Sequence, residues 1–185
     1  MRVIAGTARG VNLKTPDGMK TRPTTDRVKE AMFSIIHFDI PNANVLDLFG
    51  GTGQLGIECL SRGAKRAVFV DAAETACALI KENLRRTKLQ SEASVIRSDY
   101  MTYLKRCKET FDIILLDPPY AEEYLENALK YIAEIDILNS GGIIVTERPA
   151  EKVFPIALEG YSRSRDYKYS QSVVTIFRKM EKNEA

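Results

Sequence analysis

The 185-residue sequence has no tryptophan, one histidine and three cysteines. Its single histidine, His37, has no second histidine or cysteine pair with which to complete a zinc site or a catalytic triad, so we expect His37 to be structural. Cys59, Cys77 and Cys107 stand at no metal-ligand spacing, and an odd number fits reduced core thiols better than a disulfide framework. The sequence therefore predicts neither a metal centre nor a disulfide-stabilised domain.

Long apolar runs are also missing. No stretch approaches the roughly 20 residues that span a bilayer, and the initial segment MRVIAGTARG lacks the apolar region of a signal peptide. With 44% hydrophobic and 28% charged residues, the composition is typical of a globular protein. We expect one compact, cytoplasmic, monomeric unit without membrane contact.

A large excess of one charge is absent as well, since the net charge is only +2. The charge is nevertheless uneven: residues 1–30 carry seven basic and three acidic side chains, and residues 161–185 carry six basic and three acidic ones. If both ends fold onto one face they form a surface for a polyanion, and the alternative is solvated charge on two peripheral segments.

Strand and helix patterns alternate after Pro41. Five apolar strand patterns separated by helical patterns predict a parallel sheet covered on both faces. These strand patterns are NVLDLF, RAVFVD, ASVIRSD, FDIILLD and GGIIVTE. The last two patterns, YSRSRDYKYS and SVVTIFRK, are separated by a short turn and predict an antiparallel hairpin at the sheet edge. The prediction is an α/β fold with a mostly parallel, seven-stranded sheet that ends in this hairpin.

The first 40 residues predict a small extension. The segments VIAG and VNLKT are strand-like and flank a short turn, which indicates a hairpin. A helix begins after an N-cap at Thr24 or Thr25, because Val28, Met32 and Ile35 recur at helical spacing. We therefore divide the chain into an extension at residues 1–40 and a main domain at residues 41–185.

The segment LDLFGGTGQLG contains a glycine-rich turn. Gly51, Gly53 and Gly56 have the G-x-G-x-x-G spacing of a dinucleotide fingerprint, and Asp71 lies where that fingerprint has its ribose-binding acid. Asp47, however, immediately precedes the loop at the end of a strand. Its carboxylate would repel a pyrophosphate but suits a cationic ammonium or sulfonium, so the loop indicates S-adenosylmethionine rather than a nicotinamide cofactor.

Three acids end successive strands at the edge where open α/β sheets bind ligands. In this interpretation Asp47 contacts the ammonium group of the methyl donor, Asp71 its ribose and Asp99 its adenine amino group; each acid could instead cap the following helix. The predicted donor-binding residues are Asp47, Phe49, Gly50, Gly51, Gly53, Asp71, Asp99, Tyr100 and Asp117.

The segment FDIILLDPPY ends a buried strand with Asp117, Pro118, Pro119 and Tyr120. It matches the [DNS]-P-P-[YFW] motif of methyltransferases that act on nitrogen in a planar system. The lone pair of such an amine is delocalised, so Asp117 and the Pro118 carbonyl would accept its hydrogens and direct the lone pair at the methyl group. Tyr120 would stack on the base, which is flipped out of any helix first. These four residues are the predicted catalytic turn.

With these motifs the chain resembles the RsmD-like family of bacterial small-subunit (16S) ribosomal RNA guanine-N2 methyltransferases. The resemblance rests on RVIAGTARG, TRPTTDRVKEAMFSII, LDLFGGTGQLGIECLSRGA, FDIILLDPPY and YKYSQSVVTIF. It implies a Rossmann-like S-adenosylmethionine-dependent methyltransferase fold and a ribosomal RNA or small-subunit partner. It also implies that Arg22, Thr24 and Arg27, with Tyr120, bind the substrate.

Four alternatives follow from the same residues. A protein-glutamine methyltransferase is the less favoured one, because its usual turn begins with Asn. A DPPY turn also serves the N6 amine of adenine in DNA or RNA. A noncatalytic RNA-binding protein would keep the basic ends without needing both Asp47 and Asp117. A nicotinamide oxidoreductase would use the glycine loop for pyrophosphate.

Overall fold

The structure is a computed structural model that describes residues 1–16, 26–119, 122–151, 156–169 and 171–181. Its helices and strands alternate along most of the chain. In order they are α1 (Asp26–Ile35), η1 (His37–Asp39), β1 (Asn44–Asp47), α2 (Gln54–Ser61), β2 (Arg66–Asp71), α3 (Glu74–Thr87), η2 (Gln90–Glu92), β3 (Ala93–Arg97), α4 (Tyr100–Arg106), β4 (Phe111–Leu116), α5 (Glu122–Ile135), β5 (Leu138–Pro149), β6 (Tyr161–Arg163), β7 (Tyr167–Tyr169) and β8 (Ser172–Lys179).

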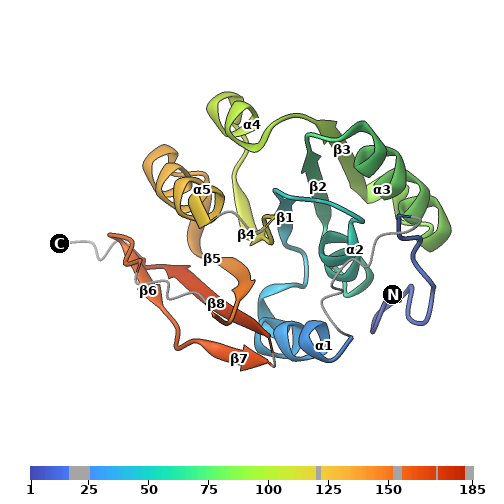
Figure 1. Ribbon diagram of the computed structural model, residues 1–185, viewed down its shortest axis with the longest axis horizontal. Coiled ribbons are helices and arrows are strands. Elements are labelled where there is room, and N and C mark those ends of the chain that lie inside the picture. The colour runs from blue at the N-terminus through green and yellow to red at the C-terminus, as the bar shows by residue number, and fades with distance from the viewer. Residues whose placement is uncertain (17–25, 120–121, 152–155, 170, 182–185) are drawn as a thin grey trace.

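The strands form one sheet in the order β3-β2-β1-β4-β5-β8-β6, with β7 also paired to β8. The first five strands are parallel, and β8 is antiparallel to β5 and to both β6 and β7. The predicted parallel sheet and terminal hairpin are therefore confirmed. The sheet has eight strands rather than seven because the strand opposite β8 is interrupted at residues 164–166, where the Ser164 hydroxyl accepts the Ile176 N–H (Figure 1).

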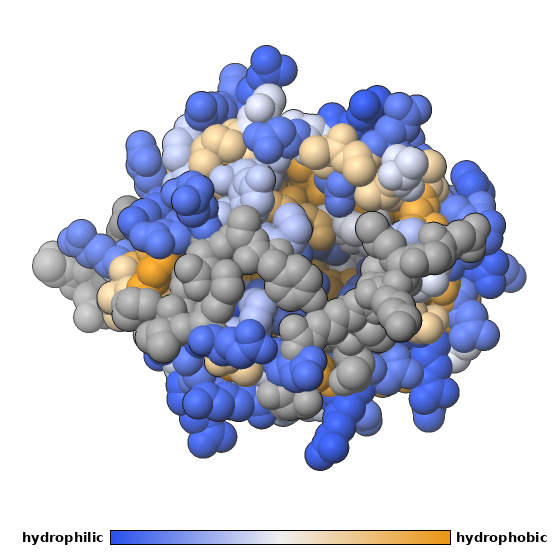
Figure 2. Space-filling model, in the orientation of Figure 1, coloured by the Kyte–Doolittle hydropathy of each residue, from blue (hydrophilic) through white to orange (hydrophobic). Residues whose placement is uncertain are grey.

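Helices cover both faces of the sheet, as the uninterrupted apolar strands require. Figure 1 shows α4 and α5 on one side and α1, α2 and α3 on the other. The apolar core accordingly divides into two clusters, one on each face. On the face seen in Figure 2, hydrophilic residues dominate the periphery, and apolar residues reach the surface in separate patches between them.

The N-terminal segment packs against α2 and α3. Arg2 and Asn12 form an antiparallel bridge, in keeping with the expected hairpin. Val3 and Leu13 are buried in the same cluster as α1 and α2, and the side chain of Asn83 on α3 donates to the Lys14 carbonyl. The first 40 residues thus share a core with the rest, and the boundary at residue 40 stays a prediction.

His37 lies in the exposed η1 turn, where its ring contacts that of Phe38, and its structural role stays a prediction. The expectation that all three cysteines lie in the core is wrong for Cys107. Cys107 is the C-cap of α4 and is only partly buried, whereas Cys59 and Cys77 are buried free thiols. Within the described residues, no helix has both the length and the apolarity needed to cross a bilayer.

Candidate active site

Four acidic residues lie at the carboxyl ends of four adjacent strands. Asp71 ends β2, Asp47 ends β1, Asp117 follows β4, and Glu147 lies near the end of β5. Because β2, β1, β4 and β5 are parallel neighbours in that order, these residues meet at one edge of the sheet. This edge, outside the carboxyl ends of parallel strands, is where open α/β sheets bind ligands.

The four acids also share one face of the sheet. Side chains alternate along a strand, and the residues two positions before the four acids, which are Val45, Phe69, Leu115 and Val145, all belong to the core cluster beneath α1, α2 and α3. Pro118 favours an extended conformation for Asp117 and so continues the alternation. The sheet therefore presents the acids as a row rather than scattering them over both faces.

The glycine loop joins this row to α2. Gly53 is the N-cap of α2 with φ 78°, a left-handed conformation that favours glycine. The Gly51 N–H donates to Asp71 Oδ2 at 2.9 Å, and the Ala73 N–H donates to Asp71 Oδ1 at 2.9 Å. Asp71 is thus held at the end of β2, beside the loop.

Gly56 allows α2 to approach the sheet closely. A Cβ at this position would lie 2.3 Å from the Phe69 ring, so a larger residue would push the helix away. The Gly56 N–H donates to Asp47 Oδ2 at 3.0 Å. The third glycine of the spacing therefore serves packing, as it does in a dinucleotide fingerprint, and its N–H also orients Asp47.

Asp47 is a buried carboxyl, only 2% exposed. Burial raises its pKa to about 7, the Gly56 hydrogen bond opposes this rise, and the negative charge of Asp71 adds to it. Within the described part of the chain Asp47 makes no ion pair. A cationic ligand group at this position would relieve the cost of ionising Asp47.

Asp117 is electrostatically coupled to its neighbours in the row. Its pKa is raised well above the usual range, first by removal of its carboxyl from water and then by the negative charges of Glu147 and Asp47. Perturbed carboxyls that converge at a cleft edge are candidates for catalysis. The structure therefore brings Asp47, Asp71 and Asp117 together, as the sequence predicted.

Three aromatic rings gather on the side of the sheet that α4 and α5 cover. Phe49 follows β1, and its ring centroid is 5.2 Å from that of Tyr100, which begins α4. Tyr100 in turn meets Tyr124 of α5 edge to face at 5.5 Å. Such rings offer flat apolar surfaces to a planar heterocycle. Phe49 and Tyr100 were predicted from the sequence, whereas Tyr124 was not.

Asp99 has a structural task at the start of α4. Its Oδ1 atom accepts the backbone N–H groups of Met101 and Thr102 at 3.0 and 3.1 Å, so it is an N-cap. Asp99 is exposed, and its role toward adenine stays a prediction.

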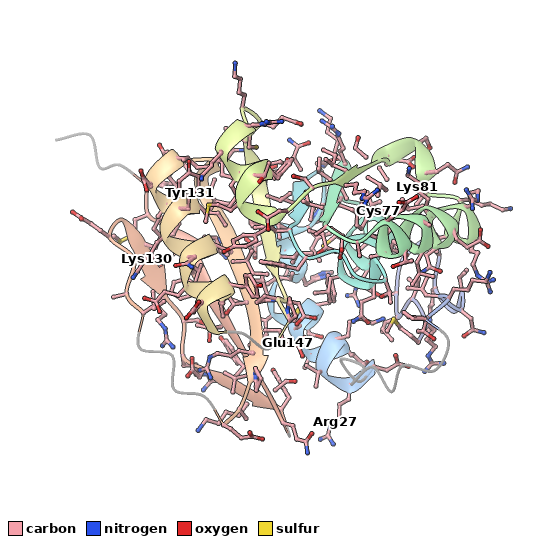
Figure 3. The ribbon with its side chains drawn as sticks, turned by 45° about the horizontal axis from the view of Figure 1, so that its top comes forward. Arg27, Cys77, Lys81, Lys130, Tyr131 and Glu147 are labelled. Atoms are coloured by element: carbon pink, nitrogen blue, oxygen red, sulfur yellow. The ribbon has the colours of Figure 1, made fainter. Side chains whose placement is uncertain are left out.

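The predicted substrate-binding residues lie mostly outside the described residues. Arg22, Thr24 and Tyr120 fall there, as does the helix N-cap expected at Thr24 or Thr25. Arg27 is exposed in the first turn of α1 and points outward at the rim of the molecule (Figure 3). Pro118 and Pro119 follow Asp117 at the edge of the sheet, where both are accessible.

Glu147 is the acid that sequence reasoning missed. It closes the strand pattern GGIIVTE, as Asp71, Asp99 and Asp117 close theirs, but its strand continues to Pro149. The same rule, an acid at the carboxyl end of a parallel strand, could have found it. Its burial next to Asp117 depends on the pairing of β4 with β5, which the sequence does not show.

This fold and this row of acids define a class, the S-adenosylmethionine-dependent methyltransferase fold with a mostly parallel sheet and an antiparallel end. The chain itself belongs to the family described as Conserved hypothetical protein 95, whose model matches residues 1–178. The predicted resemblance to the RsmD-like proteins is confirmed by the relatives that follow.

Relatives and solved structures match almost the whole chain. YlbH of Bacillus subtilis is 40% identical over 182 residues, covering 97% of this chain and 99% of its own. The Escherichia coli K12 protein named Ribosomal RNA small subunit methyltransferase D is 30% identical over 185 residues, covering 100% of this chain and 93% of its own. The solved structure of yhhF from Escherichia coli has a TM-score of 0.88 at 30% identity and covers 97% of this chain and 98% of its own.

Proposed function

We propose that the protein transfers a methyl group from S-adenosylmethionine to the exocyclic N2 amine of a guanine in small-subunit ribosomal RNA. The observation that carries the proposal is the placement of Asp117, at the start of an Asp-Pro-Pro turn, in one row with Asp47 and Asp71. The names of relatives that cover nearly the whole chain support ribosomal RNA as the substrate class.

The chemistry of the row suits the methyl donor. Asp47 is buried without an ion pair among the described residues and is matched to the donor's ammonium group. Asp71 retains lone pairs for ribose hydroxyls, because each of its oxygens accepts only one backbone N–H here. The rings of Phe49 and Tyr100 would hold the adenine of the donor. When bound, the donor supplies an electrophilic methyl group on a sulfonium.

Asp117 prepares the acceptor amine. It accepts one N–H of the amine while the Pro118 carbonyl accepts the other, so the nitrogen lone pair points toward the methyl group at about 3 to 3.5 Å. The N–C bond then forms as the C–S bond breaks, and the sulfur keeps that bond's electron pair. The amine nitrogen loses one proton, for which Asp117 is suited because its pKa is raised.

Charge at the rim is suited to RNA. Arg27 lies outward at the start of α1, and Arg165 and Lys168 are exposed beside the β6–β7 interruption. Phosphate contacts of this kind position a nucleic acid without specifying sequence. The acceptor base must be unpaired or flipped to reach Asp117.

Nucleoside analysis tests the proposal directly. Small subunits and naked small-subunit RNA from cells lacking the gene are incubated with the protein and labelled S-adenosylmethionine, and the labelled nucleoside is identified by mass spectrometry. We expect N2-methylguanosine. Detection of N6-methyladenosine would mean that adenine, not guanine, is the target base. Binding of NADH without binding of S-adenosylmethionine would reject the proposal that the protein is a methyltransferase.

A further inference from the structure

Glu147 is the partner of Asp117 across the strands. Leu116 pairs with Thr146 in the parallel register of β4 and β5, so the next positions, Asp117 and Glu147, stand side by side. Adjacent strands are about 4.8 Å apart. Both side chains belong to the face covered by α1, α2 and α3, because Leu115 and Val145 precede them by two residues on that face. The two carboxyls are therefore immediate neighbours.

The surroundings of Glu147 keep it close to the candidate active site. It is 8% exposed, and on its other side it pairs with Val174 of β8, which is fully buried. Figure 3 shows Glu147 near the middle of the molecule, whereas Arg27 lies at the rim. Its negative charge acts on Asp117. Glu147 thus stands at the inner wall of the site, not at its entrance.

The proposed acceptor has two adjacent groups of donors. On its Watson–Crick edge guanine presents N1–H next to the N2 amine, whereas adenine presents an unprotonated N1 next to its N6 amine. Flipped bases are read by hydrogen bonds to this edge. A second carboxylate beside Asp117 would accept N1–H of guanine but would repel the lone pair on N1 of adenine.

We propose that Glu147 is a specificity-determining residue that accepts the N1–H of the target guanine while Asp117 accepts its N2 amine, an assignment that rests on the proposed methyl transfer to guanine. In this assignment each acid of the row has its own role. Asp47 and Asp71 hold the donor, Asp117 orients the reacting nitrogen, and Glu147 reads the neighbouring ring nitrogen. The last two acids together select guanine over adenine.

The test replaces the target guanine by 2,6-diaminopurine, which keeps the 2-amino group but has a lone pair at N1. The nucleotide methylated by the wild-type protein is mapped, and a synthetic fragment with either base is ligated into small-subunit RNA, used naked or reconstituted, whichever the wild type methylates. We expect the wild-type protein to prefer guanine by at least about 100-fold in kcat/KM, because the analogue leaves a buried carboxylate facing a lone pair.

Glu147→Gln should reduce this preference to about threefold or less, since an amide can donate as well as accept. The matched control is Glu151→Gln, which removes the same charge from an exposed residue and should keep the preference. A wild-type preference that survives Glu147→Gln, or a wild-type protein that methylates both bases equally, overturns the assignment; the second result needs no variant to fold. Absence of N2-methylguanosine with the wild type would instead reject the proposed function.

Discussion

Two groups of buried acids in this protein are built in opposite ways. Glu58 on α2 is fully buried and accepts the backbone N–H groups of Ile4 and Ala5, and it forms ion pairs with Lys29 and Arg62. Asp47 is also buried and Asp117 is partly buried, but within the described residues neither forms an ion pair. The fold itself neutralises the charge of Glu58, whereas the charges of Asp47 and Asp117 are left for a ligand to neutralise.

The two arrangements have different roles: Glu58 stabilises the fold, and the row of acids serves the proposed chemistry. Glu58 joins the N-terminal segment, α1 and α2, and its partners are all supplied by the fold. The row at the strand ends gathers like charges, which raises the cost of ionising each carboxyl. Such an arrangement opposes stability, and it is typical of sites that bind a cation or move a proton.

The largest effect should come from breaking the satisfied cluster. Glu58→Gln leaves the buried ammonium of Lys29 without its carboxylate, which costs about 3 to 5 kcal/mol for a buried pair. Glu126→Gln, which breaks the exposed Glu126–Lys130 pair on α5, should cost about 0.5 kcal/mol or less. Urea unfolding measures both. Equal losses would mean that the buried cluster is not a structural anchor.

Asp117→Ala should remove most methyl transfer while leaving donor binding intact, because the proposed role of Asp117 is toward the acceptor. Losing one preorganised group of this kind typically lowers kcat about 100-fold to 1,000-fold. Turnover on small subunits and calorimetric donor affinity are measured on the same variant. A parallel loss of donor affinity would assign Asp117 to the donor site instead.

Asp47→Asn should weaken donor binding by about 1 to 3 kcal/mol, the range for losing a hydrogen bond to a charged group. Calorimetry measures this loss.

The Asp47→Asn variant should also be more stable than the wild type at pH 8. The pKa of Asp47 is raised to about 7 in the folded state, so its unfavourable ionisation lowers stability as pH rises from about 4 to 7. Thermal unfolding at pH 5 and pH 8 should show the gain chiefly at pH 8, and a destabilised variant would contradict the electrostatic account.

Donor affinity should depend on pH in the wild type. A cationic ligand favours ionised Asp47, so binding releases a proton, and affinity should fall by up to about tenfold per pH unit below pH 7, where Asp47 becomes protonated. Calorimetry in buffers of different ionisation enthalpy counts the proton. The comparison is with Asp47→Asn, whose affinity should be lower but nearly independent of pH between 6 and 8.

The smallest effect should come from changing an exposed charge at the rim of the molecule. Arg27→Glu should weaken RNA binding modestly, and the loss should shrink as salt is raised, because an exposed phosphate contact is screened. Filter binding at two salt concentrations measures this. A loss that does not depend on salt would place Arg27 in a desolvated contact and not at the periphery.

The sequence alone determined the parallel sheet, the terminal hairpin and the positions of Asp47, Asp71 and Asp117. Apolar strand patterns, glycines and prolines act over a few residues, and an acid at a strand end is visible without knowing which strands pair. The same locality explains why Cys107 was expected in the core, since the burial of a helix end depends on what packs against it.

Only the tertiary structure decided how the acids combine. Strand order and register bring Asp117 beside Glu147, 30 residues away, and close approach of α2 orients Asp47 through Gly56. Both Glu58 and Asp47 are single acids among apolar residues in the sequence. In the fold, the carboxylate of Glu58 is paired with buried donors, whereas burial raises the pKa of Asp47 to about 7. The physical reason is that desolvation and charge coupling depend on neighbours in space, which parallel strands separated by helices take from distant parts of the chain.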